Sequence, residues 1–253
     1  MKIGIIGSGA MGRYFAAQFV KLGHAVSIAN SRGPASLRQV ASDTGAAAAT
    51  VEEATSDKNV IIVSIPQKNV PDLPKHLFAH LPKDVLVIDT CNYYPDIRDG
   101  IIPELEQSGI DSLWVQQQLG TPVVKVFNSI TAESISALGR PKGDKDRIAL
   151  AVSGDKTDAK EVAFGLVEAL GFDPFNVGTI AQSWKQQPGS SIYCRDLKLE
   201  EIKTRVLAMG DDWSAQRDAI RTKHSADMAL IIIDYPIPVT VARKEVHWGF
   251  RVG

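Results

Sequence analysis

Cysteine is scarce in this chain of 253 residues, and long apolar runs are absent from it. Cys91 and Cys194 lie far apart in the sequence and form no metal-binding or redox motif. Their small number suits a reducing cytoplasm. No apolar run reaches the length of a membrane-spanning helix, and no basic region followed by an apolar core opens the chain. We therefore expect a cytoplasmic protein without a targeting peptide or a membrane partner.

An excess of charge of one sign is also absent. The chain holds 28 lysine and arginine residues against 29 aspartate and glutamate residues, which gives a net charge of −1. Such a balance gives no reason to expect nucleic acid or an anionic membrane surface as a partner. At this length the chain can bury a sizeable core, either as one large domain or as a domain with an appendage.

Metal-binding and nucleophile motifs are lacking as well. The sequence contains no H-E-x-x-H or G-x-S-x-G pattern, and its five histidines are scattered. His76 and His80 would share one face of a helix, but no third metal ligand is evident near them. A solvated helix face is the simpler interpretation, so we expect neither a metal site nor a catalytic triad.

Glycine, in contrast, has a regular spacing near the start of the chain. A short apolar run over residues 2–6 precedes Gly7-Ser8-Gly9-Ala10-Met11-Gly12, and a helical pattern then continues to Leu22. A strand, G-x-G-x-x-G and a helix in this order are typical of a dinucleotide-binding unit. Gly7 permits the tight turn, Gly9 lets the backbone approach a pyrophosphate, and Gly12 allows close packing of helix on strand. The free N–H groups at the helix start would face the pyrophosphate.

The end of the second predicted strand, residues 25–29, indicates which dinucleotide is bound. An NAD site usually carries an acidic residue at this point, which binds the ribose 2′-hydroxyl. This chain instead has Asn30, Ser31 and Arg32. Ser31 can donate a hydrogen bond to a 2′-phosphate, and Arg32 can pair with that phosphate or stack on the adenine. The sequence therefore predicts NADP(H) over NAD(H); a solvated loop arginine is the alternative interpretation of Arg32.

Strand-like and helical patterns alternate along most of the chain, which predicts an α/β class with a Rossmann-type, doubly wound and mainly parallel sheet. Further strands are expected at residues 59–65, 84–89, 123–127, 147–152 and 172–177. One proline-interrupted helix is expected over residues 70–81. A helix that ends at Gly171 has a possible capping box, Asp158 with Glu161, and an apolar face made of Val162, Ala163, Leu166, Val167 and Leu170.

The alternation stops after residue 177, and the last part of the chain is harder to interpret. One helix there has Leu199, Ile202 and Val206 on its apolar face, with Asp196 as a possible cap. We predict an NADP-binding domain over residues 1–178 and a small C-terminal appendage over residues 179–253. That appendage would contact the substrate or form a homodimer contact.

Five segments of the chain together resemble a known family. They are Gly7 to Gly12, Asn30 to Arg32, Ser64-Ile65-Pro66, Asp89 to Asn92 with Pro95, and Val124 to Asn128. In this order they resemble the F420-dependent NADP oxidoreductases, whose nucleotide domain is shared with the reductase domain of the STEAP metalloreductases. The resemblance extends over about residues 1–209, so the tail from Gly210 departs from the family pattern.

The resemblance implies a site for NADP(H). Gly7, Ser8, Gly9, Ala10, Met11 and Gly12 would hold the pyrophosphate, and Asn30, Ser31 and Arg32 would surround the 2′-phosphate. Ser64, Ile65 and Pro66 would border the nicotinamide nucleotide, while Asn92 and Asn128 would lie near the nicotinamide or the hydride acceptor. A turn or a helix cap is the alternative role for the two asparagines.

The implied reaction is hydride transfer between NADPH and a small-molecule ring acceptor, coenzyme F420 or a flavin. Such a transfer needs two stacked rings and a dry site, and it needs little acid or base help from side chains. Trp184, Tyr193 and Trp248 could stack on the acceptor, although packing is the simpler role for each. The alternatives are a dehydrogenase of the hydroxyacid or pyrroline-carboxylate type, which adds a long helical domain, and a non-catalytic NADP(H)-binding regulator.

Overall fold

The computed structural model describes residues 1–234, in which one eight-stranded sheet has the order β3-β2-β1-β4-β5-β6-β7-β8. The strands are β1 Lys2–Ile6, β2 Ala25–Ala29, β3 Ala47–Ala49, β4 Val60–Val63, β5 Leu86–Asp89, β6 Val124–Lys125, β7 Ala149–Ser153 and β8 Asp173–Gly178. Neighbouring strands run parallel except at β6 and β7, which are antiparallel and pair at Lys125 and Ser153. The expected doubly wound, mainly parallel sheet is confirmed.

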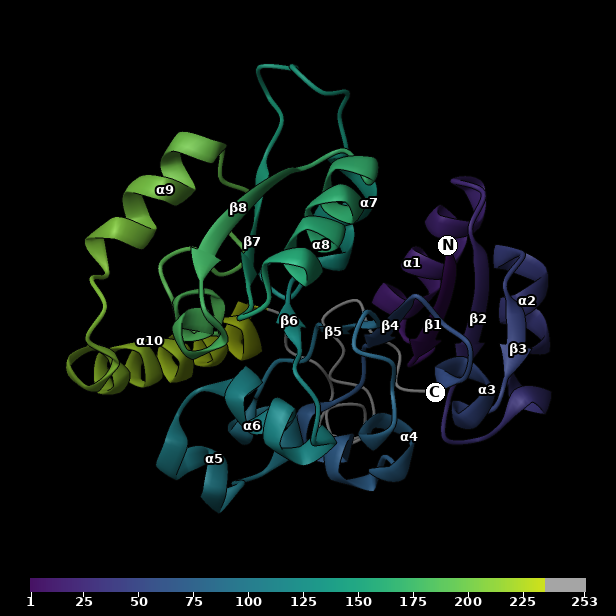
Figure 1. Ribbon diagram of the computed structural model, residues 1–253. Helices are drawn as coiled ribbons and strands as arrows, with labels where there is room; N and C mark the ends of the chain where they lie inside the picture. Colours follow the sequence, from purple (N-terminus) through teal and green to yellow (C-terminus); the bar gives the residue numbers. More distant parts are fainter. Residues whose placement is uncertain (235–253) are drawn as a thin grey trace.

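Helices connect the strands and cover both faces of the sheet (Figure 1). They are α1 Ala10–Lys21, α2 Arg38–Thr44, α3 Val51–Thr55, α4 His76–Ala79, α5 Pro103–Ser108, α6 Asp111–Leu119, α7 Ala132–Ala137, α8 Thr157–Ala169, α9 Leu199–Ala208 and α10 Trp213–Asp234. Shorter helical turns are η1 Pro34–Leu37, η2 Gln67–Asp72, η3 Pro95–Asp99 and η4 Ile180–Gln186. Within the described residues, no helix has the length and apolar composition that crossing a membrane requires.

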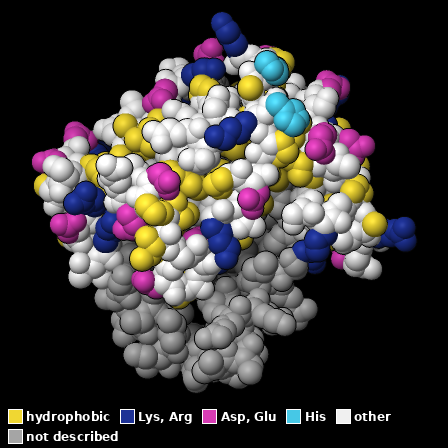
Figure 2. Space-filling model, turned by 90° about the horizontal axis from the view of Figure 1, so that it is seen from below, with side chains coloured by type: hydrophobic (Ala, Val, Ile, Leu, Met, Phe, Trp, Pro, Cys, Tyr) yellow, Lys and Arg dark blue, Asp and Glu magenta, His cyan; other side chains and the backbone are white. Residues whose placement is uncertain are grey.

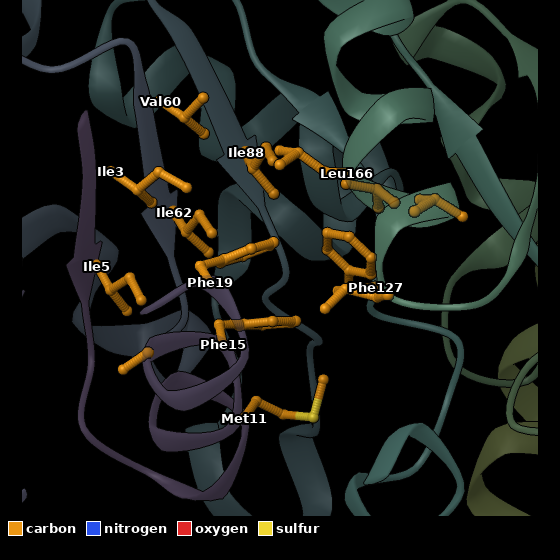
Figure 3. Packing of buried hydrophobic residues seen from close by; sticks show 14 of the residues in the cluster. Ile3, Ile5, Met11, Phe15, Phe19, Val60, Ile62, Ile88, Phe127 and Leu166 are labelled. Carbon is orange, nitrogen blue, oxygen red and sulfur yellow. The ribbon is translucent and has the colours of Figure 1, made fainter. Parts of the chain in front are cut away.

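The sheet divides the main core into two layers, which explains why the central strands are apolar at every position. In β4, Val60 and Ile62 belong to one hydrophobic cluster, whereas Ile61 and Val63 belong to the other. Side chains alternate between the two faces of a strand, so a strand buried on both faces needs apolar residues throughout. On the first face, Phe15 and Phe19 of α1 point toward the strands and toward Phe127 (Figure 3).

The segment that follows β8 packs against the same sheet. Ile202 and Val206 of α9 share a cluster with Ala149 and Ala151 of β7. The start of α10 lies on α5 and α6: the Trp213 ring contacts Trp184, and its Nε1 donates to the Ser108 carbonyl at 3.2 Å. The predicted boundary at residue 178 and the homodimer contact stay predictions.

Several details of the helices differ from the expectation. Residues 70–81 form two short turns, η2 and α4, because Pro71 and Pro74 each remove a backbone donor and Pro74 disfavours helix in the residue before it. Asp158 does not cap α8: the helix begins at Thr157, so this carboxylate lies inside the first turn. Val162 is 40% exposed, at the edge of the otherwise buried stripe of α8.

One helix end, one cap and one apolar position also differ from the prediction. The predicted helix over residues 10–22 ends one residue earlier, since Leu22 follows the last residue of α1 and is 44% exposed. Asp196 does not cap α9, because Leu197 enters the core between it and the helix, and its carboxylate accepts a hydrogen bond from Ser134 Oγ at 2.7 Å. Leu199, predicted on the apolar face of this helix, is exposed at the start of α9.

Candidate functional site

The turn after β1 brings two strands into contact at their carboxyl ends. Gly7 has φ +122°, a conformation that favours glycine. A Cβ atom at Gly7 would lie 2.0 Å from the carbonyl oxygen of Ser64, which follows β4. The tight turn predicted at Gly7 is therefore present, and it needs glycine because a side chain does not fit between the ends of β1 and β4. This point, where the strand order reverses, is where open α/β sheets bind ligands.

The helix that leaves this turn presents free backbone donors. Gly9 precedes α1 and offers no side-chain cap to the first N–H groups. A Cβ atom at Gly12 would lie 2.0 Å from the Gly7 carbonyl oxygen, so α1 can approach β1 because residue 12 is glycine. Met11 is buried in the core, so it can contribute to a ligand site through its backbone alone. Ser8, Gly9 and Ala10 are partly exposed.

The loop after β2 is joined to this turn by the side chain of Asn30. Its Nδ2 donates to Ser8 Oγ at 3.2 Å and to Ser36 Oγ at 3.0 Å, and its Oδ1 accepts from the Arg32 N–H at 2.9 Å. Ser31 and Arg32 are both exposed directly after it. The three residues thus form one edge of the glycine turn, and none of the three carries a carboxylate that would repel a phosphate.

Ser64, Ile65 and Pro66 leave β4 beside Gly7 and are partly exposed. Gln67, which follows them, is fully buried and was not among the residues predicted from the sequence. Its Nε2 donates to the backbone oxygen of Asp111 at 3.2 Å. The strand end is therefore anchored to the start of α6.

Asn92 and Asn128 lie in direct contact, although 36 positions separate them in the chain. Asn92 Nδ2 donates to the Asn128 carbonyl at 3.0 Å, and Asn128 Nδ2 donates to Asn92 Oδ1 at 3.0 Å. Thr131 caps α7, so the alternative role of Asn128 as that helix cap is wrong. We call Asn92 and Asn128 the amide pair.

Gln186, which the sequence did not predict, holds the amide pair in place. Its Nε2 donates to Asn128 Oδ1 at 2.9 Å and to the Ala151 carbonyl at 3.1 Å, and its Oε1 accepts from Ser153 Oγ at 2.6 Å. The side chain is fully buried at the junction where β7 runs antiparallel to β6. A buried amide with all these partners rigidifies the site.

A buried ion pair joins the two strand ends that lead to the amide pair, three residues before each asparagine. Lys125 Nζ is 3.1 Å from Asp89 Oδ2, and both side chains are fully buried. Asp89 also accepts from Ser112 Oγ at 2.8 Å and from the Cys91 N–H at 2.8 Å, while Lys125 donates to the Cys91 carbonyl. These bonds fix the carboxyl ends of β5 and β6.

The aromatic candidates have separate positions. Trp184 is buried and packs on Trp213, as expected for a packing residue. The Tyr193 hydroxyl is hydrogen-bonded to that of Tyr94, two residues after Asn92, and burial raises the pKa of both. Trp248 lies outside the described residues. Tyr193 is therefore the aromatic candidate that the structure brings close to the amide pair.

His76 begins α4 and His80 directly follows its last residue, and both lie at the opposite edge of the sheet. A cavity of about 570 Å³ at the amino ends of β4 and β5 is lined in part by His76 and His80. Among the described residues, no group of three or more histidine, cysteine, aspartate or glutamate side chains could hold a metal ion. In the view from below, histidine side chains lie at the surface, and charges of both signs are interspersed on this face (Figure 2).

Residues 2–93 match the sequence profile of a family described as NADP oxidoreductase, coenzyme F420-dependent. This stretch contains the glycine turn, Asn30 to Arg32, Ser64 to Pro66 and Asn92, so the resemblance inferred from the sequence is confirmed over it. The metalloreductase STEAP3 of Rattus norvegicus is 32% identical over 189 residues, which cover 72% of this chain and 35% of that protein. The chain covers less than half of the curated relatives that it matches, 41% of one and 35% of the other.

Two solved structures are similar over most of their length. A hypothetical protein from Sinorhizobium meliloti has a TM-score of 0.65 at 29% identity, with 78% of this chain and 96% of that chain covered. A candidate F420-dependent NADP reductase from Arthrobacter sp. has a TM-score of 0.60 at 21% identity, with 85% and 94% covered. At that identity the second likeness concerns the fold alone. Both structures share the Rossmann-like fold of this chain.

Proposed function

We propose that this protein is an NADPH-dependent oxidoreductase that transfers a hydride between NADP(H) and a ring acceptor such as coenzyme F420 or a flavin. The observation that carries the proposal is the edge formed by Gly7, Ser64 and Asn30 at the carboxyl ends of β1, β4 and β2. It combines a backbone cradle for a pyrophosphate with a strand end that has no carboxylate.

Charge supports the choice of NADP(H) over NAD(H). A 2′-phosphate beside Asn30 would meet the hydroxyl of Ser31 and the guanidinium of Arg32, which lie exposed on the same loop. Arginine binds phosphate through charge-assisted and often bidentate hydrogen bonds. Asn30 already has its own amide oxygen bonded to the Arg32 N–H, which fixes the loop before the nucleotide arrives.

Bound NADPH would supply the hydride, and the protein would position the nicotinamide ring and exclude water from it. The amide pair and Gln186 form a rigid, hydrogen-bonded surface next to the ends of β5 and β6. Because these side chains are hydrogen-bonded to other protein groups, they need not rearrange during the transfer. This arrangement suits ring-to-ring transfer, in which the cofactors carry the chemistry.

The acceptor class is proposed from two sources. The family that matches residues 2–93 is described as F420-dependent, and the Arthrobacter neighbour carries a similar description. Tyr94 and Tyr193 also lie next to the amide pair, where an aromatic ring could be packed. A homodimer and a cytoplasmic location are proposed from the sequence alone.

The test is a stopped-flow panel in which the purified full chain is mixed with NADPH and, in turn, F420, FMN, FAD, a quinone and a ferric chelate. We expect NADPH oxidation with a deazaflavin or a flavin, and faster oxidation with NADPH than with NADH. Binding of NADPH without oxidation by any acceptor would contradict the enzymatic part of the proposal. Failure to bind NADPH would contradict all of it.

A further inference from the structure

Three segments that border the candidate site converge on one buried residue, Asp111, at the start of α6. Gln67 Nε2 donates to the backbone oxygen of Asp111 at 3.2 Å. The backbone N–H of Asp111 donates to Gln187 Oε1 at 3.3 Å. Its carboxylate Oδ2 accepts from the Tyr93 N–H at 3.3 Å. Asp111 itself is 4% exposed.

Each of the three partners of Asp111 directly follows, in the sequence, a residue that borders the candidate site. Gln67 directly follows Pro66, Tyr93 directly follows Asn92, and Gln187 directly follows Gln186. Each partner is therefore the next residue after one that borders the site. Gln67 and Gln187 contact the Asp111 backbone, and Tyr93 contacts its carboxylate. A shift of Asp111 caused by a change at its carboxylate would therefore be passed to three sides of the site through one peptide unit each.

We propose that Asp111 is a positioning residue for hydride transfer, which holds the ends of β4 and β5 and the loop after η4 at the spacing that the two rings need. A change in its charge would change that spacing. The inference rests on the proposed function for the reaction, but the contacts that carry it are independent of the acceptor.

The surroundings make the charge of Asp111 sensitive to pH. Burial raises the pKa of its carboxyl to about 7; the charge of Lys125 and the Tyr93 N–H oppose the rise, and the charges of Asp89 and Asp99 add to it. The facing groups are Asp89 on β5, Lys125 on β6, Asp99 with Arg98 on η3, and the two tyrosines Tyr93 and Tyr94.

Two of the three buried aspartates in this region are paired with cations, and Asp111 is the third. Asp89 pairs with Lys125, and Asp99 pairs with Arg98 at 2.8 Å. Asp111 has no salt bridge to any residue in the part of the chain that the structure describes. Loss of its proton therefore adds a net negative charge to a buried site, where charges interact more strongly than in water.

Two variants separate the charge of Asp111 from its shape. Asp111→Asn keeps an oxygen that can accept from Tyr93 and removes the charge, whereas Asp111→Ala removes both. The exposed Asp218→Asn on α10 is the matched control. The rate of NADPH oxidation by the best acceptor is measured in single turnovers from about pH 5.5 to about pH 8.5, together with the affinity for NADPH.

We expect the wild-type rate to change near pH 7, and Asp111→Asn to lose that change while its NADPH affinity stays within about threefold. Asp111→Ala should be slower by about tenfold or more at every pH, because small displacements of the rings cost large factors in rate. The same pH dependence in Asp111→Asn as in the wild type, or a full rate in Asp111→Ala, would overturn the proposal.

Hydrogen exchange decides the inference even if no acceptor is found. In the NADPH-bound or the free protein, exchange in residues 67–73, 93–99 and 186–194 should depend on pH beyond its chemical rate in the wild type and not in Asp111→Asn. Equal corrected profiles in the two proteins would refute the role of Asp111. Absence of NADPH binding to the wild type would instead refute the proposed function.

Discussion

Replacing Asp111 by asparagine should stabilise the fold at alkaline pH. The folded protein holds the Asp111 proton up to about pH 7, whereas the unfolded chain releases it near the ordinary pKa of 3.8. Between these values the folded state binds more protons, so the free energy of unfolding falls as the pH rises. The stability is fully present below the unfolded pKa and is lost as the pH passes the folded pKa.

The size of the effect follows from the interval of about three units. At about 1.4 kcal/mol for each unit, ionisation of Asp111 costs the folded state up to about 4 kcal/mol above pH 8. The amino end of α6 favours a carboxylate, which makes this value an upper limit. Asparagine never ionises, so the variant avoids the whole loss.

The assay is urea unfolding of the wild type and Asp111→Asn between about pH 4 and about pH 9, with the difference in unfolding free energy plotted against pH. That difference should rise with pH in favour of the variant and level off above about pH 8. The control is Asp57→Asn: its salt bridge and hydrogen bond with Lys2 lower the pKa of Asp57 below its ordinary value of 3.8, so both states are ionised over this range and its difference should stay nearly flat. A flat profile for Asp111→Asn, or a variant that is less stable at about pH 8, would refute the argument.

The remaining predictions concern the ion pair, the glycines and the loop arginine. Lys125→Met leaves Asp89 buried without its cation and should lower the unfolding free energy by about 3–5 kcal/mol, while the double variant with Asp89→Asn should recover part of the loss in the same unfolding assay. Gly7→Ala should abolish NADPH binding in calorimetry, because the new Cβ atom would lie 2.0 Å from the Ser64 carbonyl oxygen. The matched control is Gly165→Ala on the exposed face of α8, which should raise the free energy of unfolding by about 1 kcal/mol. Arg32→Ala should weaken NADPH binding by about 2 kcal/mol and leave NADH binding unchanged, with Arg140→Ala as the control; equal losses for both nucleotides would exclude a 2′-phosphate contact.

The sequence predicted those parts of the fold and site that depend on local chemistry. Gly7 and Gly12 were found because a tight turn and a close helix leave no room for a Cβ atom, and β4 was found because a strand buried on both faces has apolar residues throughout. Gly4 carried a similar signal that was missed. Its Cβ would lie 1.7 Å from the Ala54 carbonyl oxygen of α3, and glycine inside a buried strand often marks such a close backbone approach.

Other features depend on contacts that no local pattern encodes. Gln186 and Asn128 are 58 positions apart, and their bond exists because β7 reverses direction beside β6. Phe127 has φ +65°, a conformation uncommon for a bulky residue, which places its ring against Phe15 while the next residue joins the amide pair. Asp111 resembles an ordinary first-turn acid in the sequence, and only the assembled core shows that it is buried among Asp89, Asp99 and Lys125.

The central claim is that the edge formed by Gly7, Asn30 and Ser64 binds NADP(H) and discriminates against NAD(H). Titration calorimetry of the full chain with NADPH and with NADH tests it most directly. We predict that NADPH binds at least about tenfold more tightly, a difference of about 1.4 kcal/mol or more, and that raised salt reduces this preference. Equal affinities, or tighter binding of NADH, would contradict the account.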